Sequence, residues 1–200
     1  MTIPSPALAS AGREPPLRLL LTACGRHGGI VALMEEAAPV IAAALALPLR
    51  HLADPEAPPE ALAALHAPPA AGDAGWLAPL PLDPGLPLPG ACCWAEVLGA
   101  GRQPCLLLLR GDELDTGRPA AAAALLRQWH APLLGLLQVG GPWCASARRD
   151  DGLPWLGWLP RRGDTPGEPS RDWDEGVAAG LVDARLLPLL RRRLALLDLT

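Results

Sequence analysis

Short apolar runs bounded by glycine, proline or charged residues recur along this chain. They occupy residues 17–23, 105–109, 133–139 and 155–159. Each run is too short for a typical helix, and runs of this length are typical of strands that are buried on both faces. The pattern therefore predicts strands that begin near Leu17, Cys105, Leu133 and Trp155 and lie side by side in one sheet.

A helical pattern separates the second of these runs from the third. Residues 118–129 are rich in alanine and leucine, and Pro119 stands near the first turn, where a proline is tolerated. Strand, helix and strand at this spacing are typical of a right-handed βαβ unit, whose two strands are parallel. We therefore predict an α/β fold, with a mostly parallel sheet and helices on both faces.

The same pattern predicts further elements. Helices are expected over residues 30–47, 60–66, 91–98 and 177–197, and a short strand over 49–52. Pro39 and Pro188 lie inside two of these helices and predict a kink or a break. Residues 72–89 are punctuated by proline and predict a largely looped or extended connection. Residues 1–16 predict a flexible leader, which leaves residues 17–200 as one α/β domain.

Composition narrows the chemistry that the chain could perform. The net charge of −4 gives no reason to expect a nucleic-acid partner, because binding phosphate backbones requires a basic surface. All 17 basic residues are arginine, and the chain contains no lysine and no asparagine. No catalytic step can therefore use a lysine or asparagine side chain.

The cysteines indicate a reducing compartment. There are five, none in a CxxC pair, and this favours free thiols over a zinc site or a disulfide framework. We therefore expect a cytoplasmic protein. No charged segment followed by an apolar segment opens the chain, and proline or glycine interrupts the longest apolar runs. This pattern predicts no membrane span.

A glycine-rich segment follows the first predicted strand. Residues 24–29 read CGRHGG and predict a tight turn over residues 25–29, with a helix starting near Ile30. Such a loop and the helix that follows it can bind a phosphate through their backbone amides. An ordinary strand-to-helix turn has the same sequence signature. The candidate anion-binding residues of this loop are Gly25, Arg26, His27, Gly28, Gly29, Ile30 and Val31.

Four segments together resemble dethiobiotin synthetase and its relatives among the P-loop ATPases, which include the cobyrinate amidotransferase and the ParA and MinD groups. TACGRHGGIV resembles the family's TGTDTGVGKT loop, and AGDAGWLAPLPL resembles its EGAGGLLVPL segment. WAEVLGAGRQPCLLLL with RGDELDTG is similar to its helix, strand and LGxxNH turn. HAPLLGLLQVGGP and LPWLGWLP are similar to its later strands. The likeness covers residues 17–52 and 71–160, mainly through apolar pattern and glycines.

The resemblance implies a P-loop NTPase-like fold and an ATP-dependent carboxylation and ring closure that uses Mg-ATP. It also implies a homodimer, by analogy with the family. The chain departs from the family's functional residues. The loop lysine and threonine fall on Ile30 and Val31, and the second lysine falls near Arg50 or His51. The acidic magnesium ligand falls on Ala71, two residues from Asp73.

The asparagine that contacts adenine in the family falls near Gln138 or Val139.

The resemblance and these departures lead to two functional hypotheses. In the first, the chain is a diverged dethiobiotin-synthetase-like protein with a decayed ATP site and a non-catalytic binding or regulatory role. In the second, it is an active ATP-dependent ligase of the biotin pathway whose site is rebuilt with arginine. The missing lysines favour the first, because phosphoryl transfer needs cations at the phosphate oxygens.

Other candidate groups have both functional and structural interpretations. His27 could be a base or an anion contact, or a solvated loop histidine. His51, Asp54 and Glu56 could form the substrate side of a site at a strand end, although Asp54 is also typical of a turn. Asp112, Glu113 and Asp115 could bind a metal or form a solvated acidic turn, so no metal ligand is assigned. The seven tryptophans favour core and rim packing.

Overall fold

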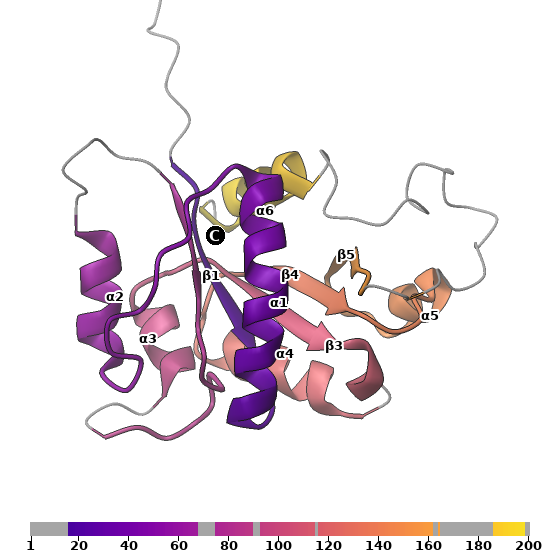
Figure 1. Ribbon diagram of the computed structural model, residues 1–200, viewed down its shortest axis with the longest axis horizontal. Helices are drawn as coiled ribbons and strands as arrows, with labels where there is room; N and C mark the ends of the chain where they lie inside the picture. The colour runs from indigo at the N-terminus through magenta and orange to yellow at the C-terminus, as the bar shows by residue number, and fades with distance from the viewer. Residues whose placement is uncertain are drawn as a thin grey trace, which may run out of the picture.

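The computed structural model describes residues 16–67, 75–89, 93–114, 116–161, 164 and 186–198. The elements in chain order are β1 (Arg18–Ala23), α1 (His27–Leu45), α2 (Pro58–His66), β2 (Trp76–Pro79), α3 (Trp94–Ala100), β3 (Cys105–Arg110), the short 3-10 helix η1 (Gly111–Glu113), α4 (Arg118–Gln128), β4 (Leu133–Val139), α5 (Ala145–Asp150), β5 (Trp155–Leu159) and α6 (Leu186–Asp198). Figure 1 shows their arrangement.

The five strands form one sheet in the order β2-β1-β3-β4-β5, and every neighbouring pair is parallel. The four predicted strands are confirmed, each within one residue of its expected start, and they lie together as expected. Their leucine-rich sequences suit a sheet covered on both faces. The α/β class with a parallel sheet is therefore correct.

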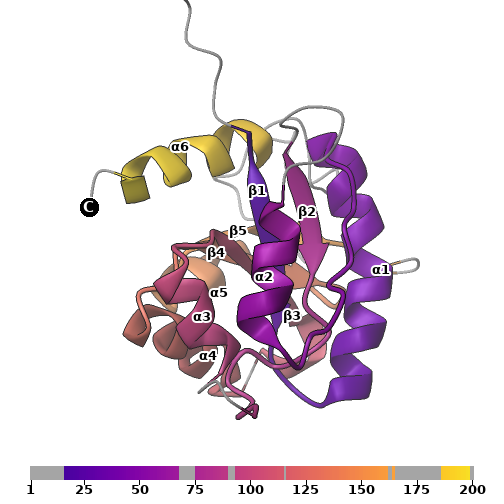
Figure 2. The same cartoon turned by 90° about the vertical axis from the view of Figure 1, so that its left-hand side faces the viewer.

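Alternate strand residues bury against helices on opposite faces. Leu19 and Leu21 of β1 belong to a core with α1 and α6, whereas Leu20 belongs to a core with α2, α3 and α4. On the second side, Leu107 and Leu136 pack with Ala122 of α4. Figure 2 shows α1 on the opposite side of the sheet from α2 and α3. The predicted coverage of both faces follows from the two-residue period of the strand.

Helix α1 differs from the prediction in its start and its continuity. It begins at His27 rather than near Ile30, and it continues through Pro39 without ending there. Its length and composition alone would allow it to cross a membrane, a possibility that the sequence pattern did not indicate. In this fold Ile30, Leu33 and Ile41 are buried against the sheet. Packing on the sheet supports the helix despite the hydrogen bond that Pro39 cannot donate.

The segment before the sheet's edge was predicted incorrectly. The expected strand over residues 49–52 is reduced to a single parallel bridge between Leu49 and Leu77. The strand lies instead at β2, inside the proline-rich connection that was expected to be looped or extended. Pro79 ends β2, and proline is tolerated at such an edge position because it cannot donate to the ladder.

Helix boundaries elsewhere shift by a few residues. The helix expected over 91–98 is α3, the helix expected over 118–129 is α4, and α5 was not anticipated. Pro188 lies in the first turn of α6, where a missing N–H costs little, and residues 177–185 lie outside the described residues. Residues 1–15 of the predicted leader also lie outside them.

The carboxyl ends of β1 and β3 form the place where ligand sites of open α/β sheets usually occur. The helix after β1 covers one face, and α4, which follows β3, covers the other. The strand order reverses here, because β2 is added on one side of β1 and β3 on the other. A crevice outside the strand ends is expected at such a point. The glycine-rich segment after β1 and the acidic segment after β3 therefore meet at one edge of the sheet.

Candidate functional site

The turn after β1 is shorter than the predicted one. Only Cys24, Gly25 and Arg26 separate the end of β1 from the start of α1. Gly25 has φ 137°, a conformation that favours glycine. The predicted turn over Gly25–Gly29 is therefore wrong in its extent, because residues 27–29 belong to the first turn of the helix, where they are exposed.

The carboxylate of Asp83, from the segment after the neighbouring strand β2, binds the backbone of this turn. The Gly25 N–H donates to Oδ2 of Asp83 at 2.9 Å, and the Gly85 N–H donates to Oδ1 of the same side chain at 2.9 Å. Asp83 follows β2, whose carboxyl end lies beside that of β1. The backbone amide that would bind a ligand anion in a phosphate loop already has an anionic partner from the chain itself.

The hollow at this turn is small. Its volume is about 20 Å³, and its walls include Gly25, Arg26, Ile30, Arg110 and Glu113. A cavity of roughly 10–15 Å³ is the least that holds one water molecule. The hollow therefore has room for about one water and not for a phosphate group.

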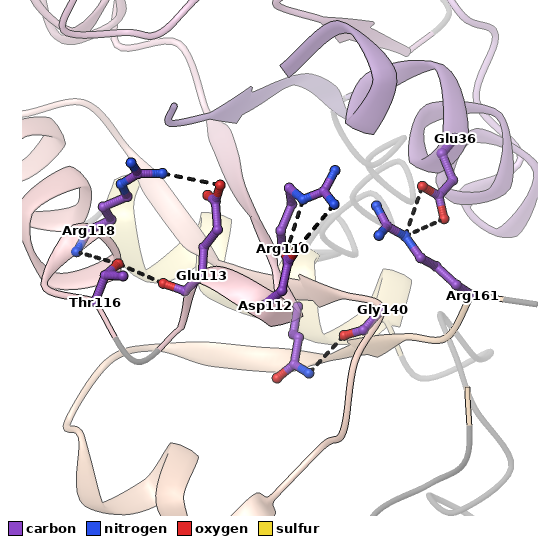
Figure 3. A network of polar contacts seen from close by, with 9 residues as sticks. Glu36, Arg110, Asp112, Glu113, Thr116, Arg118, Gly140 and Arg161 are labelled. Atoms are coloured by element: carbon purple, nitrogen blue, oxygen red, sulfur yellow. Dashed lines mark hydrogen bonds and ion pairs between the residues drawn. The ribbon is translucent and has the colours of Figure 1, made fainter. Parts of the chain in front are cut away.

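Arg110 in the wall of the hollow and Arg118 beside Gly25 are both paired with carboxylates, as Figure 3 shows. Arg26, the other arginine in the wall, forms no ion pair with a carboxylate of the described residues. Arg110 Nε lies 3.1 Å from Asp112 Oδ1, and Arg118 Nη1 lies 3.1 Å from Glu113 Oε1. The hydrogen bond between Arg110 and Asp112 raises the pKa of the guanidinium and lowers that of the carboxyl. These internal partners offset the charges of Arg110 and Arg118, which leaves Arg26 as the cation at the hollow without a paired carboxylate.

The pKa of the Cys24 thiol reflects the burial and the charges at this turn. Burial, together with the carboxylates of Asp83 and Glu113 and against a smaller opposite effect of Arg118, raises the pKa of this thiol to about 11. A site built for anions would lower a thiol pKa. The environment at the end of β1 is therefore unfavourable to an added negative charge.

The positions that match the loop lysine and threonine point to different places. Ile30 is 2% exposed and belongs to the core with α1 and the sheet. Val31 is half-buried and lines a second hollow of about 260 Å³ together with Glu35, His51 and Pro79. Ile30 therefore points into the core, whereas Val31 lines an open hollow.

This second hollow brings together two of the predicted site residues, Val31 and His51. Its walls are mainly apolar, with Met34, Pro39 and Leu52 among them. His51 is exposed, and so is Glu35. The hollow could hold a small apolar group beside a carboxylate and an imidazole, but it contains no arginine.

The remaining predicted residues at the strand end have structural roles. Arg50 Nη1 donates to the carbonyl of Leu65 at 2.8 Å and so connects the segment to α2. Asp54 Oδ1 accepts from the N–H of Glu56 at 3.0 Å, as in a turn. Asp73, Ala71 and Asp115 lie outside the described residues.

Gln138 stabilises the turn after β4. Its Nε2 donates to the carbonyls of Gly140 and Pro142, each at 2.9 Å. Val139 is fully buried. The amide nitrogen of Gln138 is therefore engaged with the backbone, whereas its Oε1 is buried and has no hydrogen-bond partner among the described residues.

No group of three or more His, Cys, Asp or Glu side chains in the described part of the chain could hold a metal ion. Four of the five cysteines are described, and all four are free thiols: Cys93 and Cys105 are buried, Cys24 is half-buried and Cys144 is exposed. His66 is structural: its Nδ1 accepts from Arg18 at 3.2 Å, and its Nε2 donates to Gln103 at 2.8 Å.

Sequence reasoning did not identify Asp83 or Arg110 as part of this site. Asp83 begins an Asp-Pro-Gly sequence, which is a turn signal, and β2 was not recognised as the strand that precedes it. Arg110 is the last residue of β3, a position where parallel sheets place ligand-binding groups. Both could have been proposed once β2 and β3 were placed beside β1.

A scan against protein-family models, a search of curated proteins and a search of solved structures each found no match to this chain. The assignment of the α/β class therefore depends on the topology of the sheet and on the packing of the helices.

Proposed function

We propose that this chain is a diverged relative of the dethiobiotin synthetase group of P-loop ATPases whose nucleotide site has decayed, and that it acts as a non-catalytic binding or regulatory protein. The observation that carries the proposal is the hydrogen bond from the Gly25 N–H to Asp83 Oδ2 at 2.9 Å. An internal carboxylate takes the place of a phosphate oxygen at the turn that resembles the family's loop. Homodimer formation remains part of this proposal by analogy with the family.

Three further features support the loss of nucleotide binding. The hollow beside Gly25 is too small for a phosphate, and Ile30 packs in the core where the family has its lysine. Gln138, near the position of the family's adenine-contacting asparagine, uses its amide for the β4 turn. The exposed amides of residues 27–29 and the dipole of α1 would retain only weak anion binding.

The alternative is an active Mg-ATP-dependent ligase with a site rebuilt from arginine. One observation favours it: Arg26 and Arg110 line the same hollow as Ile30. It would require Asp83 to leave Gly25 and Arg110 to leave Asp112 when ATP binds. Two charge-assisted contacts would be lost before any contact with ATP is gained.

A calorimetric titration of the purified protein with Mg-ATP tests the proposal. Loss of three contacts to the phosphates, the metal and the base, at about 1.5–3 kcal/mol each, weakens a micromolar site by roughly 10³ or more. We therefore expect a dissociation constant no tighter than high micromolar, and no turnover.

Low-micromolar affinity for Mg-ATP, or ADP release that depends on a diaminopelargonate-like substrate and bicarbonate, would overturn the decayed-site proposal. In that case Arg26→Gln should abolish the activity if arginine performs the work of the lysines. Arg127→Gln, at an exposed position on α4, is the matched control and should leave the activity unchanged.

A further inference from the structure

A third hollow lies beside β5 and is lined from both α5 and α6. Its volume is about 330 Å³, which is within the usual range of about 300–1,000 Å³ for small-molecule sites. Three arginines and two tryptophans contribute to its walls: Arg148, Arg149, Arg193, Trp143 and Trp155. None of these residues contributes to the hollow at Gly25.

Arg193 brings a half-buried positive charge to this hollow from α6. Its Nη1 donates to the carbonyls of Leu134 at 2.7 Å and Pro154 at 3.0 Å. Burial lowers the pKa of this guanidinium, and no carboxylate of the described residues forms an ion pair with it. Backbone dipoles compensate this charge only in part, so an anion beside it would be stabilised.

The other two arginines add unused donors. Arg148 Nη1 lies 3.3 Å from Asp151 Oδ2, and its Nε is buried without an acceptor in the described part of the chain. Arg149 is exposed, and none of the described residues forms a hydrogen bond with its side chain. A guanidinium has five N–H donors, so Arg149 offers a complete set to a ligand in the hollow.

Asp151 is the carboxylate in direct contact with these groups, and it is already engaged. Its oxygens accept from the Trp155 Nε1 at 2.8 and 3.0 Å, from the Leu153 N–H at 2.9 Å and from Arg148. It therefore orients Trp155 and Arg148, and its single charge leaves the three guanidiniums with a net positive field. The neighbouring Asp150 is exposed and does not line the hollow.

The tryptophans provide flat apolar walls. The rings of Trp143 and Trp155 meet edge to face, with centroids 6.1 Å apart and planes at 79°. The Arg148 guanidinium lies 5.1 Å from the centroid of the Trp155 ring. An aromatic corner next to several guanidiniums suits a ligand that has a flat ring and an acidic group.

We propose that this hollow, the α5–α6 site, binds a small anion that carries both a carboxylate or phosphate and an aromatic or heteroaromatic ring. Arg149 and Arg193 contact the acidic group, and Trp143 packs against the ring. This inference goes beyond the proposed function and does not depend on it, because the site uses no residue of the turn at Gly25.

Calorimetric titrations without magnesium test the inference with paired probes. AMP is compared with adenosine, and indole-3-acetate is compared with indole, so the two pairs separate a phosphate from a carboxylate. We expect at least one anion to bind in the micromolar to submillimolar range, at least about tenfold more tightly than its neutral partner. Equal binding of the neutral and anionic partners, or no binding of either anion at millimolar concentration, would overturn it.

Substitution of Arg149 then tests whether the anion binds in this hollow. Arg149→Gln should weaken the anion about tenfold or more, because the side chain lines the hollow and has no structural contact that folding requires. Arg192→Gln, an exposed position on α6 outside the hollow, is the matched control and should leave the affinity unchanged. An Arg149→Gln variant that keeps full affinity and the wild-type melting temperature would refute the site.

Asp83→Asn separates this inference from the proposed function. It alters the turn at Gly25 and should leave binding at the α5–α6 site unchanged. Anion binding that changes with Asp83→Asn and not with Arg149→Gln would place the ligand at the first turn of α1 and refute the α5–α6 site.

Discussion

Replacing Asp83 with asparagine tests the contact on which the proposed function rests. Asp83 uses both carboxylate oxygens, one for the Gly25 N–H and one for the Gly85 N–H, each at 2.9 Å. Asparagine keeps one oxygen and replaces the other with an NH2 group. If the oxygen stays on Gly85, within the same tight turn, the NH2 faces the N–H of Gly25 and that hydrogen bond is lost.

The magnitude follows from the type of contact. A hydrogen bond to a charged group contributes about 1.5–3 kcal/mol, and an orphaned buried donor costs a similar amount. We therefore expect Asp83→Asn to destabilise the fold by about 2 kcal/mol. For a domain of this size, a change of that magnitude lowers the melting temperature by roughly 4–8 °C. Differential scanning calorimetry measures it directly.

Cys24 provides an independent measurement on the same variant. Burial raises the pKa of this thiol to about 11, and Asp83 is the next largest cause. Removal of that charge should lower the pKa, so alkylation of Cys24 should begin at a lower pH. Peptide mapping after iodoacetamide treatment at several pH values yields the profile.

Asp54→Asn is the matched control. Asp54 also accepts from a backbone N–H, that of Glu56, but in an exposed turn and through one oxygen that asparagine retains. Its melting temperature should change by less than about 2 °C, since such surface substitutions stay within about 0.5 kcal/mol. If Asp83→Asn behaves like this control and the Cys24 profile does not move, the contact between Asp83 and Gly25 is absent and the argument for a decayed site fails.

Three further predictions concern other parts of the molecule. Iodoacetamide at pH 8 should label Cys144 before Cys24, because a hydrogen bond from Ser146 lowers the pKa of the exposed Cys144 thiol; faster labelling of Cys24 would contradict the charge distribution at the turn. Gly111→Ala should lower the free energy of unfolding in urea by about 3 kcal/mol, because the added Cβ would clash with the carbonyl oxygen of Gly140. The control Gly117→Ala adds a Cβ that meets nothing within 4 Å and should be nearly neutral. Gln103→Leu should cost about 3 kcal/mol in the same assay, since this 1% exposed side chain bonds an imidazole and two backbone carbonyls; a loss under about 1 kcal/mol would show that the network is dispensable.

The strands were predictable because burial on both faces leaves a local signature. Residues 133–139 and 155–159 are β4 and β5 with the expected limits. The strand β2 was missed because a run of four residues that ends in Pro79 and is soon followed by Pro81 has no such signature. Pairing with β1 in the sheet stabilises it instead. The start of α1 was placed three residues late, because glycines were expected to belong to the turn while the packing of α1 extends the helix through them.

The amino-acid sequence by itself determined the α/β class, the order of the main elements and the chemistry that is absent, namely that of lysine and asparagine. Only the tertiary structure decided which side chains surround the strand ends. Asp83 reaches Gly25 across 58 residues, and Arg193 reaches Leu134 across 59. The buried apolar runs of the main strands are visible in the local sequence, whereas such contacts depend on which strands the crossovers place side by side, and that arrangement leaves no local pattern.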